Sequence, residues 1–370
     1  MRSLTFSSFV ARFCAGILFC AALLDQGQAA DLSQLLGDGH VPGMAYAVIR
    51  DGKIADLGAI GMRDISTRTP VDENTVFEAA SLGKPVFVYA VLQLVDAGTL
   101  SLDTPLSKYA PDFVKDDPRA AEITVADVLS QTSGLPNWAS KTKALKTYFQ
   151  PGSRFSYSAE GFIWLQRVVV KVTGESLEDV MARLVFEPLK MNHSSYAWRV
   201  DFEPDYATPY DTQLGALKKR RPEKPLVAST LHTTAADYAR FLQAVLSGER
   251  LKPATAKQWL APHIVLRKHC IECIASDGAE DDQHIAWGLG WGLEPDQGSF
   301  FHWGDNKGFK SFATGWLAGK AAIVVLTNSD NGMAIMPDIL ARLMPGEHPS
   351  FAWLGYERNI GGWLGWLRSL

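Results

Sequence analysis

The chain has 370 residues, of which 47% are hydrophobic and 21% charged, and its formal net charge is −4 at pH 7. This is the composition of an ordinary globular protein, and the length suits one large domain or two that share a cleft. The mildly acidic balance gives no reason to expect a nucleic-acid partner. The densest basic run, at 218–221, lies in a polar stretch between Pro209 and Pro225. It predicts a solvated loop, with a patch for an acidic ligand as the alternative.

The N-terminus is typical of a secretory signal peptide. Arg2 and Arg12 precede an apolar run at 13–24, and small residues at 27–29 offer a cleavage point. The run is too short to span a membrane comfortably. The sequence therefore predicts a signal peptide at 1–29 and an exported protein, periplasmic or secreted.

A β-hairpin and a buried helix are the first elements expected after the signal peptide. Residues 44–64 hold two apolar runs about Asp51-Gly52, a dipeptide that favours a tight turn with positive φ. A helix is expected to start near Ser81 and to stop at Gly98. Between residues 86 and 95 it is apolar on every side, which is typical of a buried helix rather than a surface one.

The region from 103 to 231 has a mostly helical pattern with long polar loops, which predicts a helical insertion at about 100–231. Thr124 and Asp127 form a capping box for a helix that Gly134 and Pro136 would close. Further helices are expected at 161–172, at 177–185 and after the N-cap Thr234.

Strand patterns return late in the chain. The stretches 287–294, 299–304, 309–316 and 321–328 lie close together with short glycine-rich turns, which predicts an antiparallel meander. A helix at 333–344 is expected to follow. Strands at both ends with helices between them predict an α+β fold, in which one antiparallel sheet flanked by helices fills the main domain, 30–345.

The C-terminal tail, 346–370, is rich in tryptophan. Trp353, Trp363 and Trp366 predict that it docks on the body of the protein, and contact with a membrane surface or a partner is the alternative.

Two of the four cysteines fall within the predicted signal peptide, and the other two are Cys270 and Cys273. In an exported protein a local disulfide is the first interpretation of this pair. A metal site is the alternative, for which only His263 and His269 lie near in sequence.

A Ser-x-x-Lys motif occurs twice, and its context separates the two copies. The copy at 140–143 lies in a polar run where water would keep both groups ordinary. Ser81 and Lys84 instead share one face at the mouth of a buried helix, where unpaired N–H groups can stabilise an oxyanion. A neutral Lys84 could activate Ser81 as a nucleophile. Lowering a lysine pKa from ~10.4 to near 7 costs about 4.6 kcal/mol, within the reach of deep burial. The alternative is Ser81 as a helix cap and Lys84 as a snorkelling side chain.

Further motifs follow in a fixed order along the chain. They are Ser81-Leu82-Gly83-Lys84, the stretch LSQTSGLP at 129–136, Pro151-Gly152 leading to FSYS at 155–158, FEPL at 186–189, His302-Trp303-Gly304 and VVLTN at 324–328. With these motifs the chain resembles the serine β-lactamase and DD-peptidase superfamily from about residue 43 to 328. It is most similar to the branch of class C β-lactamases, D-amino-acid peptidases and family VIII carboxylesterases. The resemblance implies a β-lactamase/transpeptidase-like fold.

The resemblance also implies a role for each motif residue. Ser81 would be the acylated nucleophile, Lys84 the general base, and Tyr157 a second proton shuttle that activates water for deacylation, as a phenolate if Lys84 lies beside it. The strand bordering the cleft would carry His302 and Gly304, with Gly304 letting substrate backbone approach. The N–H groups of Asp305 and Ser81 would form the oxyanion hole. No metal or other cofactor is expected.

Two positions depart from the family pattern. Tyr157-Ser158-Ala159 lacks the asparagine that usually holds a substrate amide, and family VIII esterases commonly lack it too. His302 stands where many lactamases have a lysine for the substrate carboxylate, for which Lys307 or Lys310 could compensate. The run Ser-Asp-Asn at 329–331 matches a class A lactamase motif, but it follows the His302 strand and is interpreted as a loop.

The leading hypothesis is an exported serine hydrolase that forms an acyl-enzyme on Ser81 and cleaves an ester or a D-amino-acid or peptidoglycan-like amide. A β-lactamase or penicillin-binding DD-carboxypeptidase is the second hypothesis, with a lactam or peptide as the small-molecule substrate. A non-catalytic binding protein on the same scaffold is the third.

Overall fold

The computed structural model describes residues 27, 29–275 and 280–356. The predicted signal peptide, apart from residues 27 and 29, lies outside this part of the chain, as do Trp363 and Trp366 of the tail. Among the described helices, none is both long enough and apolar enough to pass through a lipid bilayer.

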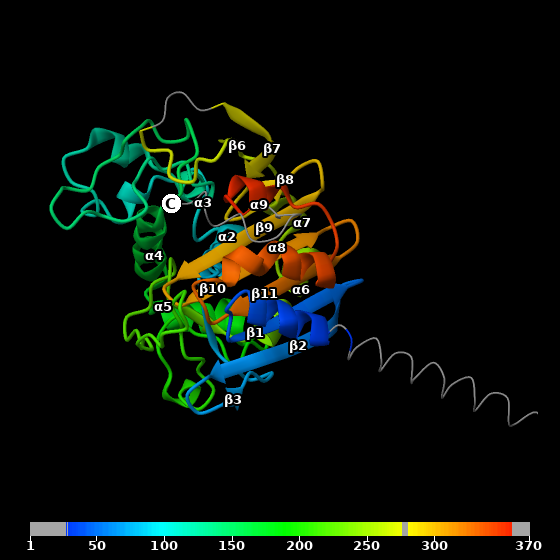
Figure 1. Cartoon of the computed structure of the whole chain (residues 1–370). Helices are drawn as coiled ribbons and strands as arrows, with labels where there is room; N and C mark the ends of the chain where they lie inside the picture. Colours follow the sequence, from blue (N-terminus) through cyan, green and yellow to red (C-terminus); the bar gives the residue numbers. More distant parts are fainter. Residues whose placement is uncertain (1–26, 28, 276–279, 357–370) are drawn as a thin grey trace, which may run out of the picture.

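Nine strands of the described chain form one antiparallel sheet that is built from both ends of the sequence (Figure 1). In spatial order they are β3 (Thr69–Pro70), β2 (Lys53–Asp64), β1 (Gly43–Arg50), β11 (Ala321–Thr327), β10 (Phe309–Trp316), β9 (Ser299–Asn306), β8 (Gly292–Glu294), β7 (Asp281–Trp287) and β6 (Ile264–Arg267). The centre of the sheet joins β1 to β11, with Met44 opposite Thr327. The predicted α+β fold and late meander are confirmed.

The hairpin of β1 and β2 turns at Asp51 and Gly52, as predicted. Both residues have positive φ, 51° and 74°, which is the backbone of a type I′ turn. β1 is buried on both faces because it lies mid-sheet, whereas burial alternates along β2, nearer the edge.

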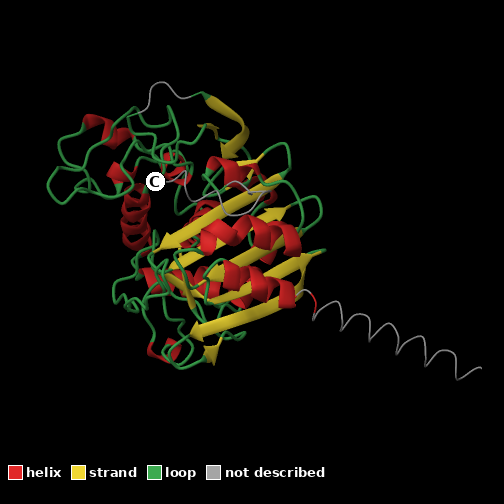
Figure 2. Ribbon diagram, viewed as in Figure 1, coloured by secondary structure: helices red, strands yellow, loops and turns green. Residues whose placement is uncertain are grey.

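Helices cover both faces of the sheet (Figure 2). On one face, Ala47 and Leu326 pack in a core with α2 (Gly83–Asp96) and α6 (Ala235–Ser247). On the other face, Tyr46 and Val325 pack against α8 (Gly332–Leu343), the helical segment 29–38 and α9 (Pro349–Trp353). The predicted helices after Ser81, after Thr234 and near 333–344 are confirmed.

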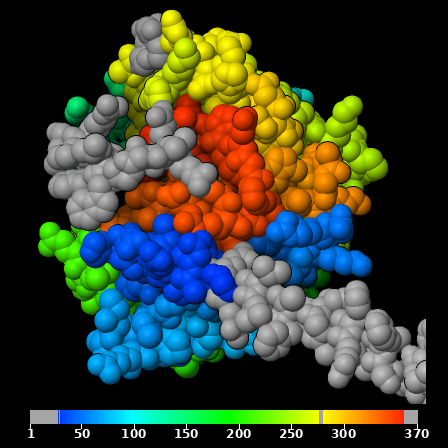
Figure 3. Space-filling model, turned by 45° about the vertical axis from the view of Figure 1, so that its right-hand side comes forward, coloured from blue at the N-terminus to red at the C-terminus, as the bar shows by residue number. Residues whose placement is uncertain are grey.

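The N-terminal helical segment 29–38 lies beside α8 on one face of the molecule, where dark-blue atoms adjoin orange ones (Figure 3). Arg342 of α8 forms an ion pair with Asp31 there. Trp353 is buried, and its Nε1–H donates to the Arg267 carbonyl at 2.9 Å. The described start of the tail therefore docks on the body, as predicted.

The region 100–231 is less helical than the sequence predicts. Its helical segments are η1 (Leu106–Lys108), η2 (Pro118–Glu122), α3 (Val125–Leu129), α4 (Ala159–Thr173), α5 (Leu177–Met181), the π-helical turn η3 (Ala182–Phe186) and η4 (Val200–Phe202). The capping box of Thr124 and Asp127 is present. α3 nevertheless ends at Leu129, before Gly134, because Gln131 adopts a positive φ of 59° that an α-helix cannot contain.

A short second sheet lies beside the large one and leads to Ser81. It pairs β4 (Phe77–Ala80) with β5 (Leu231–Thr233), and both strands are fully buried. The remaining described helix, α7 (Pro253–Trp259), follows α6.

Candidate active site

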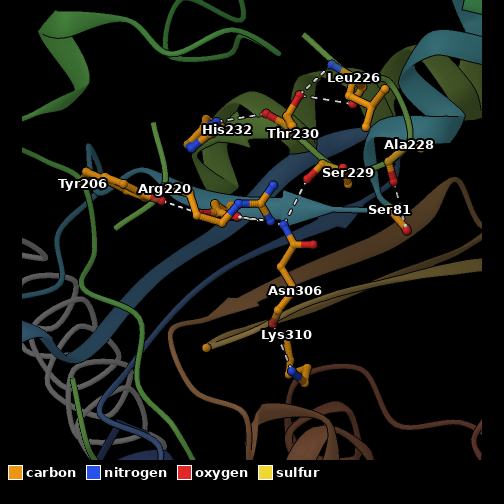
Figure 4. A network of polar contacts seen from close by, with 12 residues as sticks. Ser81, Tyr206, Arg220, Leu226, Ala228, Ser229, Thr230, His232, Asn306 and Lys310 are labelled. Atoms are coloured by element: carbon orange, nitrogen blue, oxygen red, sulfur yellow. Dashed lines mark hydrogen bonds and ion pairs between the residues drawn. The ribbon is translucent and has the colours of Figure 1, made fainter. Parts of the chain in front are cut away.

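Ser81 lies in the tight connection between β4 and α2. The residue before it, Ala80, has a φ of 51°, a left-handed conformation that is unfavourable for a side chain bearing a Cβ and is often found at functional sites. Lys84 follows in the first turn of α2, and its Nζ lies 3.0 Å from the Ser81 Oγ. The Ala228 carbonyl accepts from both groups, at 2.9 Å from Lys84 Nζ and 3.3 Å from Ser81 Oγ. Figure 4 shows the contact between Ala228 and Ser81. The predicted base, Lys84, and the predicted nucleophile, Ser81, are therefore in direct contact.

Lys84 is 1% exposed, and no carboxylate of the described residues forms an ion pair with it. Its Nζ lies 4.8 Å from the centroid of the Tyr157 ring and 5.8 Å from that of Phe162. Burial lowers the pKa of Lys84 to about 7, because the ammonium loses its hydration without gaining an opposite charge. A large fraction of this lysine is therefore neutral at neutral pH, as the sequence argument requires.

Tyr157 lies two residues before α4 and is 4% exposed. Its hydroxyl is buried and has no hydrogen-bond partner among the described residues. Burial raises the pKa of Tyr157 above its ordinary value, and the nearby Ser81 hydroxyl offsets only part of this rise. The phenolate that the sequence suggested is therefore disfavoured, because the resting site holds Tyr157 as a neutral phenol.

The N–H groups of Ser81 and Asp305 are the two predicted donors of an oxyanion hole. Among the described residues, no hydrogen bond uses the Ser81 N–H. β9 and β10 are joined by a two-residue turn, and Asn306 and Phe309 are the first pair of residues beside it. Asp305 and Lys310 form the next pair. In an antiparallel hairpin this alternation turns the Asp305 N–H away from β10, and β8 reaches only as far as Phe301 on that side.

Gly304 brings β9 close to β4. A Cβ at this position would lie 2.1 Å from the Ala79 carbonyl oxygen, an impossible contact. Ser311 on β10 donates to the same oxygen at 3.0 Å. The glycine therefore allows two strands of the protein to approach, whereas the sequence suggested that it makes room for substrate.

His302 is buried in the protein beside the Tyr157 ring and does not reach the surface of the site. It is fully buried, its Nδ1–H donates to the Trp303 carbonyl at 2.7 Å, and its Nε2 has no partner among the described residues. Burial, reinforced by the charge of Lys84, lowers the pKa of His302 to about 3. The imidazole is therefore neutral and out of reach of a substrate carboxylate.

Lys310 does not supply the missing positive charge. Its Nζ lies 2.9 Å from an Asp305 oxygen and 2.7 Å from an Asp330 oxygen. Burial alone would lower the pKa of Lys310, but these two carboxylates outweigh it and raise the pKa. Lys307 is exposed in the turn between β9 and β10.

A buried glutamate that sequence reasoning missed joins the strands around the nucleophile. Glu78 accepts from the Tyr206 hydroxyl at 2.5 Å and from the Asn306 amide at 2.7 Å, and Arg220 lies 3.5 Å away. Figure 4 labels these three partners, Tyr206, Arg220 and Asn306. The Asn306 amide also donates to the Ser229 carbonyl at 3.0 Å. An ionisable side chain in the apolar run before Ser81 was the available signal.

The basic run at 218–221 forms a loop in which Lys218, Arg220 and Arg221 are exposed, which confirms the solvated loop predicted from its charge, and several of its side chains also contact the protein. Arg220 pairs with Glu78, and Arg221 pairs with Glu203. Lys219 donates to the Tyr206 carbonyl at 2.7 Å.

Cys270 and Cys273 form a disulfide, as predicted. The Ser-Asp-Asn run at 329–331 forms the turn between β11 and α8, and the second Ser-x-x-Lys copy at 140–143 is exposed.

The fold and the site define a class of protein, the serine β-lactamase and penicillin-binding protein type. The chain belongs to the beta-lactamase family, whose model matches residues 28–343. Members of this family are serine hydrolases, among them β-lactamases, peptidases and esterases.

Curated relatives are identical to this chain at roughly a quarter of the aligned positions. A beta-lactamase of Yersinia enterocolitica is 29% identical over 244 residues, which are 61% of this chain and 60% of the relative. Penicillin-binding protein 4 of Amycolatopsis lactamdurans is 26% identical over 329 residues, which are 82% of this chain and 85% of the relative. The match to the first relative thus spans less than two thirds of its length.

Solved structures show the same fold. EstCE1, a hydrolase with promiscuous acyltransferase activity, superposes with a TM-score of 0.72 at 20% identity. The match covers 87% of this chain and 98% of the EstCE1 chain. D-alanine carboxypeptidase AmpC from Burkholderia cenocepacia has a TM-score of 0.72 at 19% identity, with 88% and 99% covered. At these identities the likeness speaks for the fold alone.

Proposed function

We propose that this protein is an exported serine hydrolase that forms an acyl-enzyme on Ser81 and cleaves a small ester or a D-amino-acid or peptidoglycan-like amide. The proposal rests on the 3.0 Å contact between Ser81 and a buried Lys84 that has no counter-ion in the described part of the chain. Burying a lysine without an opposite charge destabilises a fold, so such a pair is better explained by chemistry than by stability.

Acylation uses the neutral form of Lys84. Its Nζ takes the proton of the Ser81 hydroxyl while Oγ attacks the substrate carbonyl carbon. The oxygen of the tetrahedral intermediate accepts from the N–H groups of Ser81 and Asp305. The proton then passes from Lys84 through the Tyr157 hydroxyl to the leaving group, so that the bond breaks and Lys84 is neutral again.

Deacylation reverses these roles with water as the nucleophile. The water proton passes through the Tyr157 hydroxyl to Lys84 while the water oxygen attacks the acyl carbon. Lys84 then returns the proton to Ser81 as the ester bond breaks. Tyr157 thus relays protons without holding a negative charge, which suits a phenol whose pKa burial raises.

The residues that replace the family's substrate-binding groups favour esters. Ser158 is the N-cap of α4, and its Oγ accepts from the Gly161 N–H at 3.1 Å and donates to the Pro136 carbonyl at 2.8 Å. It therefore cannot replace an asparagine that binds a substrate amide. His302 is neutral and buried, so it cannot bind a carboxylate as a lysine would. An ester needs neither contact.

A short-chain p-nitrophenyl ester tests the proposal. We expect turnover by the purified protein, an intact-mass increase equal to the acyl group on Ser81, and loss of both in Ser81→Ala. Unchanged hydrolysis by Ser81→Ala would refute the acyl-enzyme on this residue.

A β-lactamase or DD-carboxypeptidase is the second candidate, favoured by the names of the curated relatives. A labelled penicillin separates the two: a stable adduct on Ser81 would indicate a penicillin binder, and rapid drug hydrolysis a lactamase. A non-catalytic binding protein is the third candidate, and it would fail to react with a serine-directed fluorophosphonate.

The proposed export is supported by the Cys270–Cys273 disulfide, because such bonds persist in oxidising compartments. A membrane-surface contact of the tail remains a proposal for residues 357–370. Its test is binding of the full chain to anionic lipid vesicles, with a variant truncated after Tyr356 as the control.

A further inference from the structure

The loop closed by the Cys270–Cys273 disulfide lies against Tyr157. The Tyr157 N–H donates to the Ile271 carbonyl, between the two cysteines, at 2.9 Å. Cys273 is 1% exposed and packs in the same core cluster as Phe155. The disulfide therefore fixes the carbonyl that holds the Tyr157 backbone to a point in the core.

A second contact ties the same loop to the start of α4. The Asn137 side-chain amide donates to Glu272 at 2.8 Å. The Asn137 backbone carbonyl accepts from the N–H groups of Ala159 and Glu160, at 3.1 and 3.2 Å, and its side-chain oxygen accepts again from Ala159 at 3.1 Å. Asn137 thus links the loop to the first turn of the helix that begins two residues after Tyr157.

The Tyr157 hydroxyl makes no hydrogen bond of its own among the described residues. Its position is therefore set by its backbone and by ring packing, which includes Trp303 with centroids 5.1 Å apart and Lys84 over the ring. A displacement of about 1 Å in a catalytic group can cost a hundredfold in rate. Whatever holds the Tyr157 backbone thus controls its use as a proton relay.

We propose that the disulfide-closed loop 270–273 is the positioning element for Tyr157, so that rapid turnover requires an intact Cys270–Cys273 bond. This inference rests on the acyl-enzyme function proposed above. Reduction of this bond by a dithiol would lower the turnover rate of the enzyme. Two electrons and two protons pass from the dithiol to the protein, the Sγ–Sγ bond breaks into two thiols, and the dithiol becomes a disulfide.

The effect is expected on deacylation more than on acylation. Ser81 and Lys84 lie on β4 and α2 and are held by the Ala228 carbonyl, and none of these contacts involves the loop. A disulfide that closes so short a loop also constrains the unfolded chain little, so its loss acts mainly on the local structure.

The test uses the full chain with Cys14→Ser and Cys20→Ser, which leaves one pair of cysteines. We compare the oxidised protein, the protein reduced with dithiothreitol, and the same chain with Cys270→Ser and Cys273→Ser. Burst and steady-state phases of p-nitrophenyl butyrate hydrolysis report acylation and deacylation separately. We expect the burst amplitude to stay within about twofold while the steady-state rate falls about tenfold and the acyl-enzyme accumulates by mass.

Reoxidation with oxidised glutathione should restore the steady-state rate of the reduced protein but not of the serine variant. Glu272→Ala, which removes the Asn137 contact and leaves the disulfide, should lower the same rate about threefold. Glu280→Ala, an exposed site, should not change it.

Equal steady-state rates in all redox forms would overturn the inference and leave the proposed function intact. A fall of burst and steady-state rate in proportion would also overturn it, because it indicates loss of folded protein. An oxidised protein that forms no adduct on Ser81 would overturn both.

Discussion

The two Ser-x-x-Lys copies have the same spacing and opposite surroundings. Ser81 and Lys84 are joined by a 3.0 Å contact at the head of a helix that is buried on every side. Ser140 and Lys143 are exposed, and the Ser140 hydroxyl contacts the neighbouring Thr142 hydroxyl instead. The motif alone therefore specifies nothing. Burial lowers the pKa of a lysine so that it can act as a base, and of the two copies only the first has a buried lysine.

The largest expected difference between the copies concerns the nucleophile. Ser81→Ala should lower ester turnover at least about a thousandfold and abolish labelling by a fluorophosphonate, because it removes the hydroxyl on which the acyl-enzyme is proposed to form. Ser140→Ala should leave both within about twofold. Fluorescent labelling followed by peptide mass mapping checks this, and a label on Ser140 would break the comparison.

The lysines should differ in activity and in stability. Lys84→Met should lower acylation about a thousandfold, since the base is lost, and yet stabilise the fold. Holding Lys84 neutral costs about 4 kcal/mol at pH 7 for a pKa shift from 10.5 to about 7. The lost hydrogen bonds to Ser81 and Ala228 offset part of that gain.

This cost depends on pH with a definite sign. Below about pH 7 both the folded and the unfolded chain hold Lys84 protonated, and the penalty is fully present. Between about 7 and 10.5 only the unfolded chain binds the proton, so the wild type gains stability as pH rises. Thermal unfolding should therefore show a larger gain for Lys84→Met at pH 6 than at pH 9. Lys143→Met should change the free energy of unfolding little at either pH. A gain equal to that of Lys84→Met would show that burial is not the cause.

Tyr157→Phe removes the hydroxyl and keeps the buried ring. We expect steady-state ester hydrolysis to fall about a hundredfold, within the usual range for loss of a general acid–base group. The acyl-enzyme should accumulate, which intact-mass measurement detects. Full turnover by this variant would show that the Ser81–Lys84 pair acts without a relay.

The smallest effect is the pH dependence of the acylation burst. With a Lys84 pKa of about 7, the neutral fraction rises about tenfold from pH 6 to pH 8, and the burst rate should follow it. Stopped-flow measurements at constant ionic strength check this. A rate that is flat over this interval would mean that a different group takes the Ser81 proton.

Much of the fold followed from local patterns, because the type I′ turn at Asp51, the capping box at Thr124 and the apolar strands each act over a few residues. The site was less accessible. The burial of His302 depends on aromatic rings from separate segments, Tyr157 before α4 and Trp287 of β7, and the approach of Gly304 to Ala79 depends on two separate sheets. The Glu78 contacts join four distant segments. No local pattern encodes such tertiary contacts, which is also why the loops between residues 100 and 231 were taken for helices.

The pairing of β1 with β11 has a consequence for how the chain acquires its structure. β1 can pair with β11 only after Thr327, the partner of Met44, has been synthesised. Almost the whole polypeptide must therefore be made before these two strands pair. Contacts so distant along the chain slow folding and leave unpaired strand edges open to aggregation in the meantime. A nascent chain arrested before residue 320 should therefore remain protease-sensitive throughout, and a folding helper would act on this protein late, after synthesis is nearly complete.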